Sequence, residues 1–158
     1  AVIFTCKSYK IPTLLLSDLI AVVSPIGIFL GRLANFINGE LYGRITTHKF
    51  GMIFPNGGNL PRHPSQLYEA FFEGILLFII LLSLIKIKKF FEVRGLTTVC
   101  FISFYGFFRF FIEFFREPDS QIGLVYFDFT MGQLLSLPMI IILPCFMIII
   151  YKKGRLSN

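Results

Sequence analysis

Basic and amide side chains gather with glycines in one stretch of the sequence, Gly31 to Arg44. Arg32, Asn35 and Asn38 follow one another at intervals of three, so in a helix these side chains would share a face. The planar guanidinium of an arginine suits two oxygens of a phosphate group. Two interpretations remain open, a phosphate-binding site or an interfacial loop whose arginines contact lipid headgroups. The candidate site residues of this stretch are Arg32, Asn35, Asn38, Glu40 and Gly43.

A second stretch, Tyr105 to Asp119, combines phenylalanines with ionisable residues. Tyr105, Arg109 and Glu113 are each four residues apart and would form one helical stripe, which Arg116 continues three residues later. An arginine at the centre of a membrane helix costs roughly 2.5–3.5 kcal/mol, so it is expected to face inward and to be paired. Glu113 is the expected partner of Arg109. The stripe indicates either a functional site or a structural ion pair.

A third polar stretch, Arg62 to Ala70, leads into the apolar segment that begins at Gln66. Ser65 or Gln66 is predicted to cap a helix there. His63 is a candidate base because the unperturbed pKa of histidine is about 6.5, although a single histidine before a helix also fits a structural role. Glu69 and Glu73 are one helical turn apart and would face either a cavity or the outer membrane interface.

The composition places these residues in a membrane protein. Of 158 residues, 55% are hydrophobic and 15% are charged, whereas soluble domains have about 25% charged residues. Spanning helices need about 20 mostly apolar residues. The sequence therefore predicts an all-α fold, a polytopic transmembrane helical bundle with about four full spans and the end of a preceding one. The predicted spans of this single membrane domain are 13–30, 66–85, 97–115 and 129–151, with an outer loop at 35–65.

Lysines and arginines flank the predicted spans. They occur around Lys7, between Lys86 and Arg94, and after Tyr151, and short basic loops stay in the cytoplasm. This placement predicts a cytoplasmic C-terminus and explains the net charge of +6 without nucleic-acid binding. The three cysteines are far apart, so neither a metal site nor a disulfide framework is expected.

The three polar stretches, together with Met131 to Met139, resemble the prolipoprotein diacylglyceryl transferase family, in the family's order. The resemblance covers most of the chain from Gly31 onward and corresponds to the C-terminal part of the family's chain. It implies a seven-span enzyme of the bacterial inner membrane. Such an enzyme moves the diacylglyceryl group of phosphatidylglycerol to the thiol of a lipobox cysteine in a prolipoprotein, and uses no metal or soluble cofactor.

The resemblance also implies roles for individual residues. Arg32 and Arg109 are expected to hold the lipid phosphate and to stabilise charge on the departing group, while Asn35 and Glu40 position it. The predicted catalytic residues are Arg32, Glu40, Arg109 and Glu113. The predicted substrate-binding residues are Arg32, Asn35, Asn38, Gly43, Tyr105, Arg109 and Arg116.

Two departures from the family pattern leave alternatives open. Ala34 stands where the family usually has glycine, and no His-Gly-Gly motif with the family's catalytic histidine occurs before Gly31. His63 belongs to a different motif. The alternatives are a truncated, non-catalytic lipid-binding remnant and a proton or ion transporter, although the paired broken helices of transporters are missing from the sequence. A monomer is expected.

Overall fold

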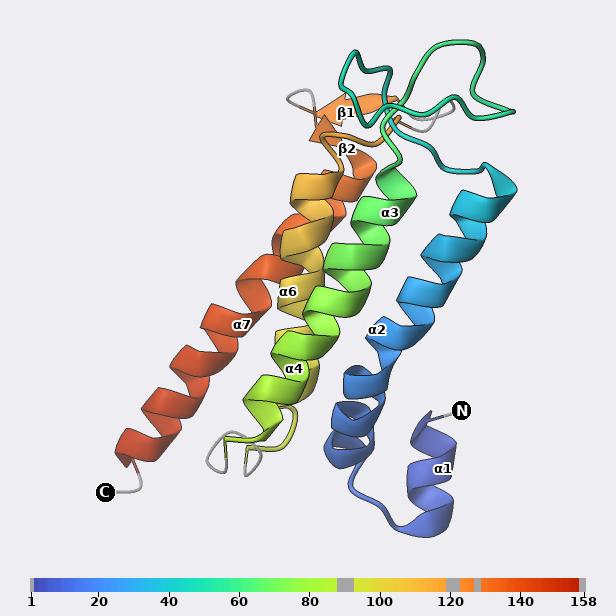
Figure 1. The fold of residues 1–158 in the computed structure, drawn as a ribbon. Helices are drawn as coiled ribbons and strands as arrows, with labels where there is room; N and C mark the ends of the chain where they lie inside the picture. Colours follow the sequence, from blue (N-terminus) through green and yellow to red (C-terminus); the bar gives the residue numbers. More distant parts are fainter. Residues whose placement is uncertain (1, 88–92, 119–122, 127–128, 157–158) are drawn as a thin grey trace.

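The computed structural model describes residues 2–87, 93–118, 123–126 and 129–156, and its main feature is a bundle of helices (Figure 1). Three helical stretches, Thr13–Asn38, Ser65–Ile85 and Met131–Ile150, are long and apolar enough to cross a membrane, and Leu96–Ile112 is a shorter apolar helix. The prediction of a helical membrane bundle is confirmed. The elements are α1 (Val2–Tyr9), α2 (Thr13–Asn38), α3 (Ser65–Glu69), η1 (Ala70–Leu76), α4 (Leu77–Ile85), α6 (Leu96–Ile112), β1 (Leu124–Tyr126), β2 (Phe129–Thr130) and α7 (Met131–Leu156).

The helix α2 continues beyond the predicted span end at Leu30 as far as Asn38. It ends at Gly39, which adopts a left-handed conformation with φ of 67° that glycine reaches without steric cost. The basic and amide residues of the first polar stretch therefore lie on the last turns of a helix. The loop that follows is correspondingly shorter at its start than the predicted 35–65.

A π-helical segment interrupts the second long helix. The segments α3, η1 and α4 follow one another without a break, and the π-helical part is Ala70–Leu76. π-Helical turns are rare and occur frequently at functional sites. Glu69 ends α3 and Glu73 lies inside the π segment, so both glutamates stand where the helix departs from regular geometry.

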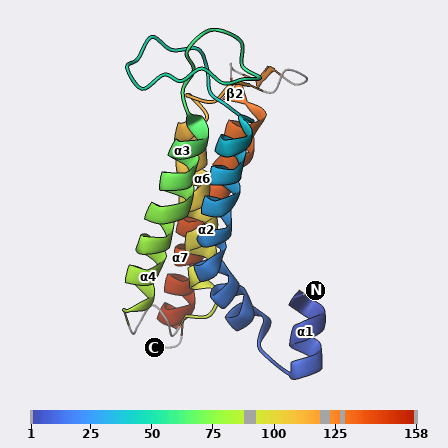
Figure 2. The same ribbon diagram turned by 45° about the vertical axis from the view of Figure 1, so that its right-hand side comes forward.

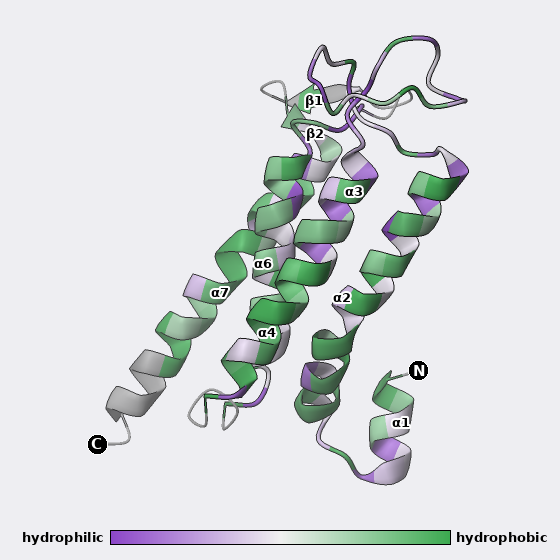
Figure 3. Ribbon diagram, viewed as in Figure 1, coloured by the Kyte–Doolittle hydropathy of each residue, from purple (hydrophilic) through white to green (hydrophobic). Residues whose placement is uncertain are grey.

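Much of the apolar surface of the bundle is not buried inside the protein. Figure 3 shows hydrophobic residues along most of the helices and hydrophilic residues concentrated in the loops that follow α2 and precede α3. Only 11% of the apolar window in α7 and 17% of that in α2 is buried inside the protein. Such surfaces require an apolar solvent, because water-soluble proteins rarely expose large contiguous apolar patches.

The helices α6 and α7 pack closely, as the two views in Figures 1 and 2 show. A Cβ atom at Gly106 would lie 2.7 Å from Cβ of Met139, so only glycine permits this approach. The hydroxyl of Ser103 donates to Met139 O at 2.8 Å and accepts from Leu143 N at 3.1 Å. Ser103 thus bonds both a carbonyl and an amide of the α7 backbone. Pro144, the next residue after Leu143 in α7, lacks the amide hydrogen of a regular helix position.

A single buried carboxylate joins α2 to the start of α6. Asp18 is 8% exposed and accepts hydrogen bonds from the amides of Gly95 at 2.6 Å and Thr98 at 2.8 Å. The hydroxyl of Thr98 also donates to Asp18 at 2.7 Å. Asp18 thereby satisfies free amides at the N-terminus of a neighbouring helix, where the helix dipole favours a negative charge.

The predicted cap of the second long helix is wrong. The helix begins after Pro64 without a side-chain capping bond. Ser65 instead donates its hydroxyl to Leu41 O at 3.0 Å, and the amide of Gln66 donates to Glu40 O. Both side chains are fully buried, and they connect this helix to the loop that follows α2.

Candidate functional site

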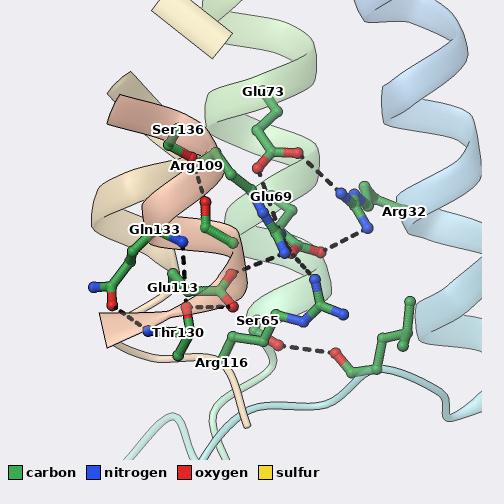
Figure 4. A network of polar contacts seen from close by, with 12 residues as sticks. Arg32, Ser65, Glu69, Glu73, Arg109, Glu113, Arg116, Thr130, Gln133 and Ser136 are labelled. Atoms are coloured by element: carbon green, nitrogen blue, oxygen red, sulfur yellow. Dashed lines mark hydrogen bonds and ion pairs between the residues drawn. The ribbon is translucent and has the colours of Figure 1, made fainter. Parts of the chain in front are cut away.

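Three arginines and three glutamates meet between α2, the α3–η1 helix and α6 (Figure 4). Arg32 of α2 places Nη1 3.2 Å from Oε2 of Glu69 and Nη2 3.2 Å from Oε2 of Glu73. Nη1 of Arg109 in α6 pairs with Oε1 of Glu69. The same nitrogen is 3.9 Å from Oε1 of Glu73. The two arginines, which come from separate helices, thus converge on the same two carboxylates. We call the six residues the Arg–Glu cluster: Arg32, Glu69, Glu73, Arg109, Glu113 and Arg116.

Glu69 is the centre of the Arg–Glu cluster. Besides Arg32 and Arg109, it has Nη1 of Arg116 3.7 Å from its Oε1. The carboxylates of Glu69 and Glu73 have no exposed surface, whereas the three arginine side chains retain between 13% and 17%. The carboxylates therefore fix the guanidinium groups from the buried side, and part of each arginine remains accessible to a ligand.

Glu113 is the predicted partner of Arg109, and the structure confirms the contact, with 2.8 Å between Nη2 and Oε2. Its other oxygen accepts a hydrogen bond from the hydroxyl of Thr130 at 3.0 Å. Thr130 and Gln133 form reciprocal bonds at the start of α7, from Gln133 N to the threonine hydroxyl and from Thr130 N to the amide oxygen of Gln133. This is a capping box, and it places the positive end of the α7 dipole near Glu113.

The remaining members of the predicted stripe also lie at the cluster. Tyr105 interacts electrostatically with Glu73, Arg109 and Arg32. Arg116, after the end of α6, has its carbonyl bonded by Nε of Arg44 at 3.0 Å. The structure therefore brings Arg32, Tyr105, Arg109, Glu113 and Arg116 together.

Gly43 lies where three segments meet. It pairs with Arg116 in an isolated β-bridge, and its amide donates to His63 O at 2.8 Å. A Cβ atom at this position would lie 2.4 Å from Phe115 O and 2.7 Å from His63 O. Only glycine fits, so Gly43 holds the outer loop against the end of α6 and has no side chain of its own to offer a ligand.

The predicted site residues Asn35, Asn38 and Glu40 lie apart from the ion pairs. Within the described part of the chain, their side chains make no hydrogen bond or ion pair. Glu40 and Arg116 line a partly polar hollow of about 570 Å³ beneath the outer loop. Arg116 therefore adjoins both the hollow and the Arg–Glu cluster.

An apolar groove of about 610 Å³ runs between the α3–η1 helix and α6, and His63, Tyr68 and Phe108 are among its lining residues. Nδ1 of His63 lies 3.3 Å from the hydroxyl of Tyr68. Burial lowers the pKa of His63 below its ordinary value of 6.5, and the nearby His48 lowers it further. These contacts support the structural interpretation of His63. Among the described residues, no group of three or more His, Cys, Asp or Glu side chains is arranged to hold a metal ion.

The sequence did not identify Glu69 and Glu73 as site residues, because their spacing fitted either a cavity or an interface. A usable signal was that Arg32, unlike Arg109, had no predicted acidic partner, and an arginine inside a membrane protein is expected to be paired. The role of Thr130 and Gln133 was also missed, although a threonine followed three residues later by glutamine is a recognisable helix start.

Apolar helices surround an ionisable cluster next to the outer loop, and these features define a polytopic helical membrane protein with a polar site inside its bundle. The sequence model of the family described as prolipoprotein diacylglyceryl transferase matches residues 1–150. The chain belongs to this family. The family prediction is confirmed.

Curated relatives carry the name phosphatidylglycerol–prolipoprotein diacylglyceryl transferase. The chain is 59% identical over 137 residues to that of Rickettsia akari, which covers 87% of this chain and 53% of the relative. It is 60% identical over 137 residues to that of Rickettsia africae, with the same coverage. It is 56% identical over 143 residues to that of a Wolbachia pipientis strain from Culex pipiens, which covers 90% of this chain and 54% of the relative. The chain thus spans about half the length of these relatives.

Proposed function

We propose that the chain takes part in transferring the diacylglyceryl group of phosphatidylglycerol to the lipobox cysteine thiol of a prolipoprotein. The observation that supports this most is the convergence of Arg32 and Arg109, from separate helices, on one buried pair of glutamates. Two guanidinium groups fixed by the same carboxylates, each on a side chain that is partly exposed, suit the oxygens of a phosphodiester. The names of the relatives supply the two substrates.

In the proposed reaction, the cysteine attacks as the thiolate, which is its nucleophilic form. The attacked atom is the carbon of the diacylglyceryl group that is bonded to a phosphate oxygen. The carbon–sulfur bond forms as the bond between that carbon and the phosphate oxygen breaks. Negative charge then builds on the departing glycerol phosphate, and Arg32 and Arg109 stabilise it. Preorganised donors of this kind are usually the largest catalytic contribution. Glu69, Glu73 and Glu113 position the guanidinium groups, while Asn35, Asn38 and Glu40 are proposed to contact the lipid headgroup.

The test is the substitution Arg109→Ala. Transfer of labelled lipid to a lipobox peptide is expected to fall by about 100-fold or more, while the amount of protein in the membrane fraction stays unchanged. The matched control is Lys49→Ala, which removes an exposed cation of the outer loop and is expected to leave transfer intact. Near wild-type transfer by Arg109→Ala would refute the proposed role of the cluster.

We further propose a location in the bacterial inner membrane, with the C-terminus in the cytoplasm and the Arg–Glu cluster near the outer leaflet. The end of α4, the start of α6 and the end of α7 lie at one end of the bundle, opposite the outer loop (Figure 1). A cysteine introduced as Lys49→Cys is expected to react with an impermeant maleimide in intact cells, and one introduced as Lys86→Cys only after permeabilisation. The reverse pattern would invert the proposed orientation.

A further inference from the structure

The Arg–Glu cluster has three positive and three negative formal charges, from Arg32, Arg109 and Arg116 and from Glu69, Glu73 and Glu113. With every group ionised it is neutral before a ligand arrives. An anionic headgroup would leave one uncompensated negative charge between helices, where burying an unpaired charge is costly. Uptake of one proton by a carboxylate removes this cost.

We propose that Glu73 takes up a proton when the phosphatidylglycerol headgroup binds, so that lipid binding is coupled to protonation of this side chain. This inference rests on the proposed function, because it takes phosphatidylglycerol as the ligand. It adds a role for Glu73 that the family resemblance does not assign.

The geometry singles out Glu73 among the three carboxylates. Glu69 contacts three guanidinium groups. Glu113 has Arg109 at 2.8 Å and also accepts the hydroxyl proton of Thr130. Glu73 has one hydrogen bond, from Arg32 at 3.2 Å, and its other guanidinium contact, with Arg109, is at 3.9 Å. Its nearest guanidinium nitrogen is therefore farther away than the nearest one to Glu69 or to Glu113. The least compensated carboxylate is the one that a proton neutralises at the lowest cost.

The groups that face Glu73 come from every helix packed around it. Arg32 faces it from α2 and Glu69 from the preceding turn, while Tyr105 and Arg109 face it from α6. The side chain is fully buried in the π-helical segment. A new anion at the two arginines would compete with Glu73 for their charge, and the adjacent Glu69 adds repulsion. Both effects favour the protonated form of Glu73 when the headgroup is bound.

Protonation also has a structural consequence for Arg32. In the structure, Nη2 of Arg32 is held by Oε2 of Glu73 at 3.2 Å, and Nη1 by Glu69. A neutral Glu73 holds this edge less strongly, because charge-assisted hydrogen bonds are about twice as strong as neutral ones. The edge then becomes available to the phosphate, while Glu69 keeps the guanidinium in place.

The experiment titrates phosphatidylglycerol into the 158-residue chain in dodecylmaltoside micelles, by calorimetry in two buffers of different ionisation enthalpy. The difference in heat gives the number of protons bound per lipid. The wild-type protein is expected to take up about one proton, and its affinity is expected to fall as the pH rises, by up to about tenfold per pH unit.

The substitution Glu73→Gln replaces the carboxylate by an uncharged side chain of the same shape. It is expected to abolish both the proton uptake and the pH dependence of the lipid affinity, while the lipid still binds. The matched control is Glu117→Gln, because Glu117 is 45% exposed, pairs with Arg62 at 3.1 Å and lies outside the cluster. The control is expected to keep the uptake.

Lipid binding without proton uptake in the wild-type protein would overturn the inference and leave the proposed function standing. Uptake that survives in Glu73→Gln would also overturn it, because the proton would then bind to another group. Absence of any phosphatidylglycerol binding by the wild-type protein would contradict the proposed function and the inference together.

Discussion

Asp18 and the Arg–Glu cluster both bury ionisable side chains, and they differ in how completely their polar atoms are hydrogen-bonded. At the end of the bundle opposite the outer loop, both oxygens of Asp18 accept hydrogen bonds. The donors are the backbone amide of Gly95, just before α6, and the backbone amide and hydroxyl of Thr98 in α6. In the Arg–Glu cluster, one oxygen each of Glu69, Glu73 and Glu113 lacks a hydrogen-bond partner among the described residues, although cations lie near.

The difference separates two uses of charge inside a membrane protein. A carboxylate whose acceptors are all occupied by backbone amides has no capacity left for a ligand, and it acts to hold one helix against another. A cluster with several charges of both signs, incomplete hydrogen bonding and partly exposed guanidinium groups can exchange internal partners for external ones. Three predictions test this comparison, and they run from the largest expected effect to the smallest.

The largest effect is expected from Glu69→Ala. This change removes the carboxylate that contacts all three guanidinium groups and leaves their charges without their central counter-ion. Removing one partner of a buried ion pair costs about 3–5 kcal/mol. The free energy of unfolding, measured in mixed SDS and dodecylmaltoside micelles, is expected to fall by about this amount, and phosphatidylglycerol binding is expected to be lost.

The matched control for this prediction is Glu117→Ala, which breaks a more exposed pair with Arg62. Exposed pairs contribute about 0–1 kcal/mol. If both substitutions lower the free energy of unfolding equally, the three guanidinium contacts of Glu69 stabilise the protein no more than one exposed ion pair does.

A smaller effect, confined to stability, is expected from Asp18→Ala. The change leaves the amides of Gly95 and Thr98 without their acceptor, and an unsatisfied buried donor costs about 1–3 kcal/mol. The unfolding free energy is expected to fall while the affinity for phosphatidylglycerol stays at the wild-type value. The control is Ser83→Ala, whose hydroxyl bonds only to a carbonyl of its own helix. A loss of lipid affinity comparable to that of Glu69→Ala would remove the distinction between the two sites.

The sequence was sufficient to predict the bundle and part of the cluster. Apolar runs of spanning length located the helices, and the spacing of Tyr105, Arg109 and Glu113 predicted an inward stripe with an internal ion pair, which the structure contains. The cost of an unpaired arginine in a membrane carried that prediction, and this cost does not depend on details of packing.

Other features depend on contacts between segments, which spacing alone does not reveal. The π-helical segment, which contains Glu73, was not predicted from the sequence, and it packs against α2, α4 and α6. The capping role predicted for Ser65 or Gln66 was wrong because carbonyls of the outer loop, Leu41 O and Glu40 O, accept their hydrogen bonds instead. The residue types showed that these side chains can form hydrogen bonds with backbone groups. Which backbone groups they bond depends on the tertiary structure.

The smallest effect is expected at His63, a titratable group outside both sites. Its pKa is lowered by burial and by His48, so the unfolded chain binds more protons than the folded one between the lowered value and 6.5. Stability is therefore expected to fall as the pH drops from 6.5 toward the folded pKa, and to level off below it. Thermal denaturation across this pH range measures the slope, and His63→Asn is expected to reduce it. A slope of opposite sign would mean that the folded protein favours the charged imidazolium form of His63. His63 would then resemble the Arg–Glu cluster, whose charges can exchange partners, rather than Asp18, whose oxygens are already hydrogen-bonded.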